Sequence, residues 1–117
     1  MGYMRHHAIV VTSGIEDLIK EAHAKARDLR CSISELVASP VNAYWSFLIA
    51  PDGSNEGWGE SDVGDAQRKA WTGWARSKAY VDGSSSLGWV EVMYHDERKE
   101  VAIVSDGDEK RRGKPNG

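Results

Sequence analysis

The pattern of apolar and polar positions divides the first thirty residues into a strand and a helix. Residues 7–12 form a nearly continuous β-branched run, which is typical of a strand. Ser13 follows, with Glu16 three residues later, and this pair predicts a capping box at the start of a helix. The apolar spacing then predicts a helix over 14–30. Its apolar face comprises Ile15, Leu18, Ile19, Ala22, Ala26 and Leu29.

The middle of the chain predicts a buried strand and a second helix. Residues 44–49 carry bulky groups on both faces, which favours a central strand. A short Ser-x-x-Glu pattern before them predicts one helical turn over 32–37, ended by Pro40. Asp62 predicts the cap of a helix that runs to about Lys78. Its apolar side comprises Ala70, Trp71 and Trp74.

The last third of the chain predicts two further strands. They cover 89–94 and 101–104, with a charged turn between them. The order β-α-β-α-β-β predicts an α+β fold, in which a small, mostly antiparallel sheet packs with two helices. We expect a single ligand-binding domain over 1–105 and a charged tail over 106–117.

Composition narrows the classes of function. The 117 residues contain a single cysteine, so an internal disulfide framework is excluded. No run approaches the roughly 20 apolar residues of a membrane span, and we expect a protein of the reducing cytoplasm. A net charge of −3 disfavours duplex DNA as a partner, because DNA-binding domains present a dominant basic face. A small nucleotide needs only a few local cations.

Basic residues recur along the first predicted helix. They stand at spacings of three, four and three residues, and we predict that they form one ridge away from the apolar stripe. Fixed cations and a histidine on one ridge can hold phosphate groups, although a solvated face with an i,i+4 ion pair has the same pattern. The ridge comprises Lys20, His23, Arg27 and Arg30.

Aromatic residues and a serine-rich turn suggest a second kind of contact. Five tryptophans are many for this length, and most of them should fill the core. Trp45 or Trp58 could instead line a ligand or a subunit interface, because an aromatic face stacks on a base. The turn over 82–86 offers backbone N–H groups that can cradle a phosphate, although it lacks the Gly-Lys-Ser/Thr of a Walker loop.

Catalytic and metal-binding patterns have little support. The acidic loop over 51–60 partly imitates a calcium loop, but Val63 stands where a bidentate carboxylate is required. Cys31 follows a helix end, where the dipole disfavours a thiolate. No nucleophile elbow is present, and nothing selects two carboxylates for acid–base chemistry. We therefore expect no catalytic residues, no cofactor and no metal.

Three segments together resemble a family of small phage proteins. They are residues 5–13, 39–53 and 82–92, which span most of the predicted strands. The chain resembles the first-described class of Thoeris anti-defence proteins, which bacteriophages and prophages encode. The resemblance implies a sponge in the infected host's cytoplasm. Such a sponge sequesters cyclic ADP-ribose isomers from TIR-domain enzymes without cleaving them. Some members also hold cyclic oligonucleotides of the CBASS type at separate sites.

The resemblance also implies a homo-oligomer, a dimer or a hexamer, with ligands at subunit contacts. Under it, the aromatic ring of Tyr44, Trp45 or Trp71 stacks on adenine. A pyrophosphate meets Arg98 and backbone groups near Ser84 and Ser85, and Asp106 or Asp108 accepts ribose hydroxyls. The helix ridge of Lys20, His23, Arg27 and Arg30 then lines a second phosphate or nucleotide site at a subunit contact.

Two other classes of function remain open from the sequence. One is a small phosphodiesterase or other hydrolase, with a metal held by the acidic loop over 52–60. The other is a protein-binding inhibitor that uses the negative loop to imitate DNA. Intact ligand after incubation would separate a sponge from the hydrolase. Capture of a host protein without nucleotide would favour the inhibitor.

Overall fold

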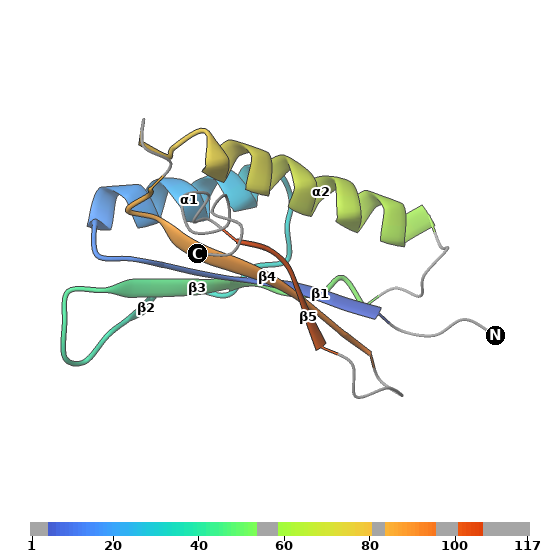
Figure 1. Cartoon of the computed structure of the whole chain (residues 1–117), viewed down its shortest axis with the longest axis horizontal. Coiled ribbons are helices and arrows are strands. Elements are labelled where there is room, and N and C mark those ends of the chain that lie inside the picture. The colour runs from blue at the N-terminus through green and yellow to red at the C-terminus, as the bar shows by residue number, and fades with distance from the viewer. Residues whose placement is uncertain (1–4, 54–58, 81–83, 96–100, 107–117) are drawn as a thin grey trace, which may run out of the picture.

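The computed structural model describes residues 5–53, 59–80, 84–95 and 101–106 (Figure 1). Five strands and two helices follow one another along these ranges. They are β1 (Arg5–Ser13), α1 (Glu16–Asp28), β2 (Val37–Ala38), β3 (Trp45–Ile49), α2 (Gly59–Arg76), β4 (Gly88–His95) and β5 (Val101–Asp106). The predicted α+β class is confirmed, with β2 as an additional short strand.

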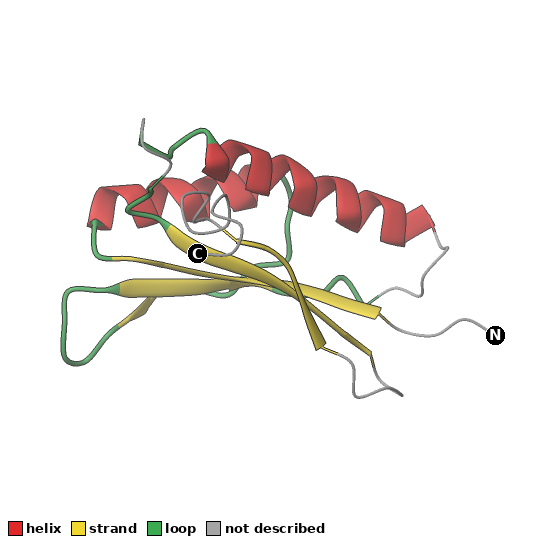
Figure 2. Cartoon of the chain, viewed as in Figure 1, coloured by secondary structure: helices red, strands yellow, loops and turns green. Residues whose placement is uncertain are grey.

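The strands form one antiparallel sheet in the order β2-β3-β1-β4-β5. The first strand is central because its continuous apolar run pairs on both sides. Val11 lies opposite Phe47 of β3 and opposite Trp89 of β4. Both helices cover the same face of the sheet, so the described residues make two layers (Figure 2).

The core lies between the sheet and the helices. Ile9 and Val11 of β1 are fully buried on this side, as are Ile19 and Ala22 of α1. At the centre is Trp71 of α2, which is also fully buried. Its indole Nε1 donates a hydrogen bond of 3.0 Å to the Ala22 carbonyl. This hydrogen bond satisfies the N–H group of the indole, and the rest of the ring contributes a large buried apolar area.

The start of α1 differs from the predicted capping box. The helix begins at Glu16, its N-cap is Ile15, and no side chain caps it. Ser13 is instead the last residue of β1, and its hydroxyl accepts the Ile15 N–H at 3.0 Å. The same hydroxyl donates to the Ser86 carbonyl at 2.7 Å, so a distant segment competes for the predicted cap.

The end of α1 places an arginine in an unusual backbone conformation. Arg30 has a φ of 63°, and its N–H donates to the Arg27 carbonyl. The next residue, Cys31, donates to the Ala26 carbonyl, which completes a Schellman motif. Glycine normally fills this left-handed position, because a Cβ there costs roughly 1–2 kcal/mol.

The predicted helical turn over 32–37 is wrong. This segment runs extended beside β3: Ser34 N–H donates to the Leu48 carbonyl, and Ala50 N–H donates to the Ser32 carbonyl. Val37 and Ala38 then pair with β3 as β2. Pairing with a neighbouring strand satisfies more backbone groups than one isolated helical turn could. The second helix also begins at Gly59, before the predicted cap at Asp62.

We predict opposite effects of alanine at two glycines of α2. Gly73 has open space around it, so Gly73→Ala should raise the free energy of unfolding by about 0.5–1 kcal/mol through helix propensity. A Cβ on Gly64 would lie 2.8 Å from Cγ of Asp52. Gly64→Ala should therefore lower the free energy of unfolding by about 1–2 kcal/mol, despite the same gain in propensity. Denaturant titration checks both, and equal stabilisation by the two variants would contradict the packing described.

Candidate ligand-binding cleft

A cleft opens where β1 turns into α1. Its volume is about 550 Å³, within the range of small-molecule sites. Residues from three distant segments line it: the β1–α1 turn, the residue before β3 and the segment that leads into β4. The lining residues are Thr12, Ser13, Gly14, Ile15, Tyr44, Ser85, Ser86 and Gly88.

Hydroxyl groups join two of these segments, the β1–α1 turn and the segment that leads into β4. The Ser13 hydroxyl joins the β1–α1 turn to Ser86, as described above. The Ser86 hydroxyl lies 2.6 Å from the Tyr80 hydroxyl, and Leu87 N–H donates to the Ser85 hydroxyl at 3.1 Å. The segment before β4 is therefore fixed by side-chain hydrogen bonds at several points, so its backbone presents a defined surface to the cleft.

One wall of the cleft is an aromatic ring. Tyr44 is 51% exposed, and its ring lies against the backbone of Gly14. A Cβ on Gly14 would lie 3.2 Å from Cε1 of Tyr44, which is tighter than ordinary contact. Glycine at position 14 therefore lets the ring approach the turn closely, and about half of the Tyr44 surface stays exposed beside the cleft.

The electrostatic character of the cleft comes from the start of α1. The first N–H groups of a helix have no partner within the helix and carry the positive end of its dipole. No side chain caps them here. Glu16 and Asp17 stand in the same turn and reduce the positive potential, although Glu16 is bound to Lys20 at 2.6 Å. This end of the cleft suits a modest anionic group.

Two of the predicted ligand residues meet in this cleft. Tyr44 and Ser85 are far apart in the sequence and both line it. Ser84 directly precedes Ser85 and accepts the Tyr80 N–H with its carbonyl at 2.7 Å. Of the three rings predicted to stack on adenine, Tyr44, Trp45 and Trp71, only Tyr44 lines the cleft.

Trp71 is not placed to stack on a base, and Trp45 does not line the cleft. Trp71 is 0% exposed at the centre of the core, so its prediction as a stacking ring is wrong. Trp45 is half-buried and packs against that core, opposite Ser13 across the sheet. Both rings lie between the layers because their positions in α2 and β3 face the opposite layer. Trp58 lies outside the described residues.

Of the acidic and basic residues predicted to meet the pyrophosphate and ribose, only Asp106 lies within the described residues, and it does not line the cleft. Asp106 ends β5 opposite Val90 and is not among the lining residues. Arg98 and Asp108 lie outside the residues that the structure describes. Pyrophosphate and ribose contacts by those two residues therefore stay predictions.

The basic ridge on α1 is interrupted. His23 is buried, and its ring meets Phe47 edge-on at 5.0 Å. Its Nε2 lies 2.8 Å from the Ser34 carbonyl, and Nδ1 lies 3.2 Å from the Arg27 guanidinium. These contacts fit a neutral imidazole with its proton on Nε2. The prediction of His23 as a phosphate ligand is wrong, because its position flanks the apolar stripe and faces β3.

The other members of the ridge are exposed but separate. Lys20 is bound to Glu16, whereas Arg27 is anchored to His23. Arg30 lies beyond the end of α1 in the left-handed position. The described structure thus offers exposed cations on α1, without the continuous phosphate site that the sequence predicts.

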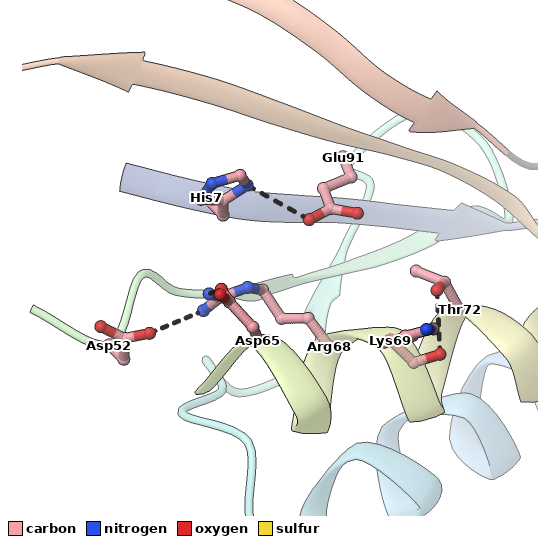
Figure 3. A network of polar contacts seen from close by, with 7 residues as sticks. All are labelled: His7, Asp52, Asp65, Arg68, Lys69, Thr72 and Glu91. Carbon is pink, nitrogen blue, oxygen red and sulfur yellow. Dashed lines mark hydrogen bonds and ion pairs between the residues drawn. The ribbon is translucent and has the colours of Figure 1, made fainter. Parts of the chain in front are cut away.

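A polar network that the sequence did not single out lies along the middle of α2 (Figure 3). The Arg68 side chain is only 6% exposed and donates to Asp52 at 3.0 Å and to Asp65 at 2.6 Å. Figure 3 also shows His7 and Glu91 of the sheet, whose side chains are 3.4 Å apart. Arg68 is already paired with two carboxylates, so it does not form an anion-binding site. Its pair with Asp52 holds that part of the chain against α2.

The described ranges contain neither a metal-binding cluster nor a membrane-spanning helix. No group of three or more histidine, cysteine, aspartate or glutamate side chains there could hold a metal ion. No helix there has the length and apolar character to cross a membrane. Residues 54–58 of the acidic loop, where the hydrolase hypothesis places a metal, lie outside the description.

Comparison with protein-family models, with curated proteins and with solved structures finds no match to this chain.

We predict that Cys31 is a slow nucleophile in the folded chain. Burial raises the pKa of its thiol, and the nearby Arg68 only partly opposes this effect. The thiolate is the reactive form, so a raised pKa leaves less of it at neutral pH. Alkylation by iodoacetamide at pH 7.5 should be slower than that of glutathione and should accelerate in denaturant. A folded-state rate equal to the denatured-state rate would contradict the burial described.

Proposed function

We propose that this protein is a sponge that binds and sequesters a cyclic nucleotide signal of the cyclic ADP-ribose type in the cleft at the start of α1. The resemblance to phage anti-defence proteins suggests the ligand class. The observation that carries the proposal is the meeting of Tyr44, the serine-rich segment and the uncapped helix start in one cleft. These are the groups that a base, a sugar and a phosphate require.

The proposal gives each wall of the cleft a role. The exposed ring of Tyr44 stacks on adenine, an interaction of about 1–3 kcal/mol in nucleic-acid sites. A phosphate oxygen accepts hydrogen bonds from the first backbone N–H groups of α1. The Ser85 hydroxyl, which accepts the Leu87 N–H, still has its own proton to donate to a sugar oxygen.

Binding without cleavage requires no groups in the site beyond those that contact the ligand. A sponge stabilises the ground state of its ligand, whereas an enzyme must stabilise a transition state more strongly. Hydroxyls, a phenol ring and backbone N–H groups supply stacking and hydrogen bonds, which suffice for affinity. The lining residues named above therefore favour sequestration over the hydrolase alternative.

Isothermal titration with cyclic ADP-ribose isomers, and with cyclic trinucleotides, tests the proposal. We expect Tyr44→Ala to weaken binding by about 10- to 100-fold through loss of stacking. Tyr44→Phe is the matched control, because it keeps the ring, and its affinity should stay within about threefold of the parent. Chromatography after incubation should return the ligand intact.

Three results would count against the proposal. One is the absence of heat with every nucleotide offered, and another is unchanged affinity in Tyr44→Ala. The third is the appearance of a linear product, which would favour the hydrolase. Because Tyr44 is exposed, its substitution should leave the melting temperature nearly unchanged, so a loss of binding would report on the site and not on the fold.

A further inference from the structure

The sheet has a second face, which neither helix covers (Figure 1). Side chains alternate between the two faces along each strand. Ile9 and Val11 of β1 face the helices, so Val10 and its cross-strand partners point away from them. Val10 lies opposite Leu48 on β3 and Val90 on β4, and these three form one row. Ala8, Val92 and Ile103 form the next row.

The composition of this open face is unusual for an antiparallel sheet. Such sheets normally alternate between apolar residues toward the core and polar residues toward water. Here the central outward positions are aliphatic: Val10 is 45% exposed, Leu48 37% and Ile103 68%. Polar Thr12, Ser46 and His6 lie toward the ends of the same face. Charged residues make up 28% of the chain, yet Asp106 is the only aspartate, glutamate, lysine or arginine among the described side chains of this face.

We infer that the open face of the sheet is the interface between two copies of this chain. Two identical faces can meet about a two-fold axis only if each is complementary to itself. A charged face would place like charges together, whereas an almost uncharged face of valine, leucine and isoleucine does not. Two twisted sheets with such side chains pack about 10 Å apart, with their strands roughly 30° from parallel.

The size of the face also fits a second copy. Four strands about 4.8 Å apart, each about six residues long at about 3.3 Å per residue, span on the order of 400 Å² of plane. Side chains that stand on this plane present more accessible surface than the plane itself. The accessible surface that each copy would bury is therefore roughly 600 Å², which corresponds to the smaller specific interfaces. The pair would have helices outside and two sheets inside.

This interface does not rest on the proposed function, because its central residues, Val10, Leu48 and Ile103, do not line the cleft. Sedimentation velocity of the full chain without nucleotide therefore tests it separately. At roughly 100 μM chain we expect a dimer. Val10→Lys, at the centre of the face, should raise the dissociation constant by at least about 100-fold, because it brings like charges together in an apolar contact.

Two further variants make this test decisive. Ile103→Lys changes a more exposed position on β5, so it should keep the fold even if Val10→Lys does not, and it should also be monomeric. Val41→Lys is the matched control, because Val41 is 84% exposed between β2 and β3, off the strands, and this variant should remain dimeric. A monomeric parent, or dimers of parental affinity in folded Val10→Lys and Ile103→Lys, would overturn the inference.

Discussion

The two layers depend on the burial of one tryptophan. Trp71 projects from α2 into the space that the sheet and α1 share, and its Nε1–H reaches the Ala22 carbonyl. Its ring meets Phe47 and Trp89 nearly edge-on, at 6.3 and 5.9 Å between centroids. Edge-to-face pairs add about 0.5–1.5 kcal/mol each beyond the area that they bury. One side chain thereby connects both helices with two strands of the sheet.

The position of α1 on the sheet also determines where the cleft lies. The helix must start just beyond β1, and Ser13 joins this turn to the segment before β4 through Ser86. Tyr44 then closes the third side, against the backbone of Gly14. The cleft is therefore formed at the short turn between β1 and α1, and the packing of both elements in the core holds this turn in place. A binding site built on such a turn has little freedom to collapse when empty.

The sequence predicted those features that depend on local periodicity. The apolar run of β1 and the helical stripe from Ile19 to Ala26 gave the correct elements, because both have one clearly buried side. Features set by distant contacts were missed. Residues 32–38 follow β3 rather than their own helical pattern, and Ser13 bonds to Ser86 rather than capping α1.

The candidate site was predictable only in part, for the same reason. Nothing local distinguishes Tyr44 from Trp71 as a stacking ring, and only packing shows that one is exposed and the other buried. His23 has the spacing of a surface ridge, but the adjacent β3 turns it inward. Arg68 carried one weak signal, the acidic Asp65 three residues earlier, while its second partner, Asp52, comes from another segment.

Hydrogen exchange of the tryptophan indole groups, followed by NMR, tests most directly whether Trp71 holds the layers together. The Trp71 Nε1–H should exchange only through global unfolding, with an opening free energy equal to the free energy of unfolding. The half-buried Trp74, in the same helix, should exchange through smaller local openings. Exchange of Trp71 as fast as that of Trp74 would contradict the account, since the central contact would then open without the rest of the fold.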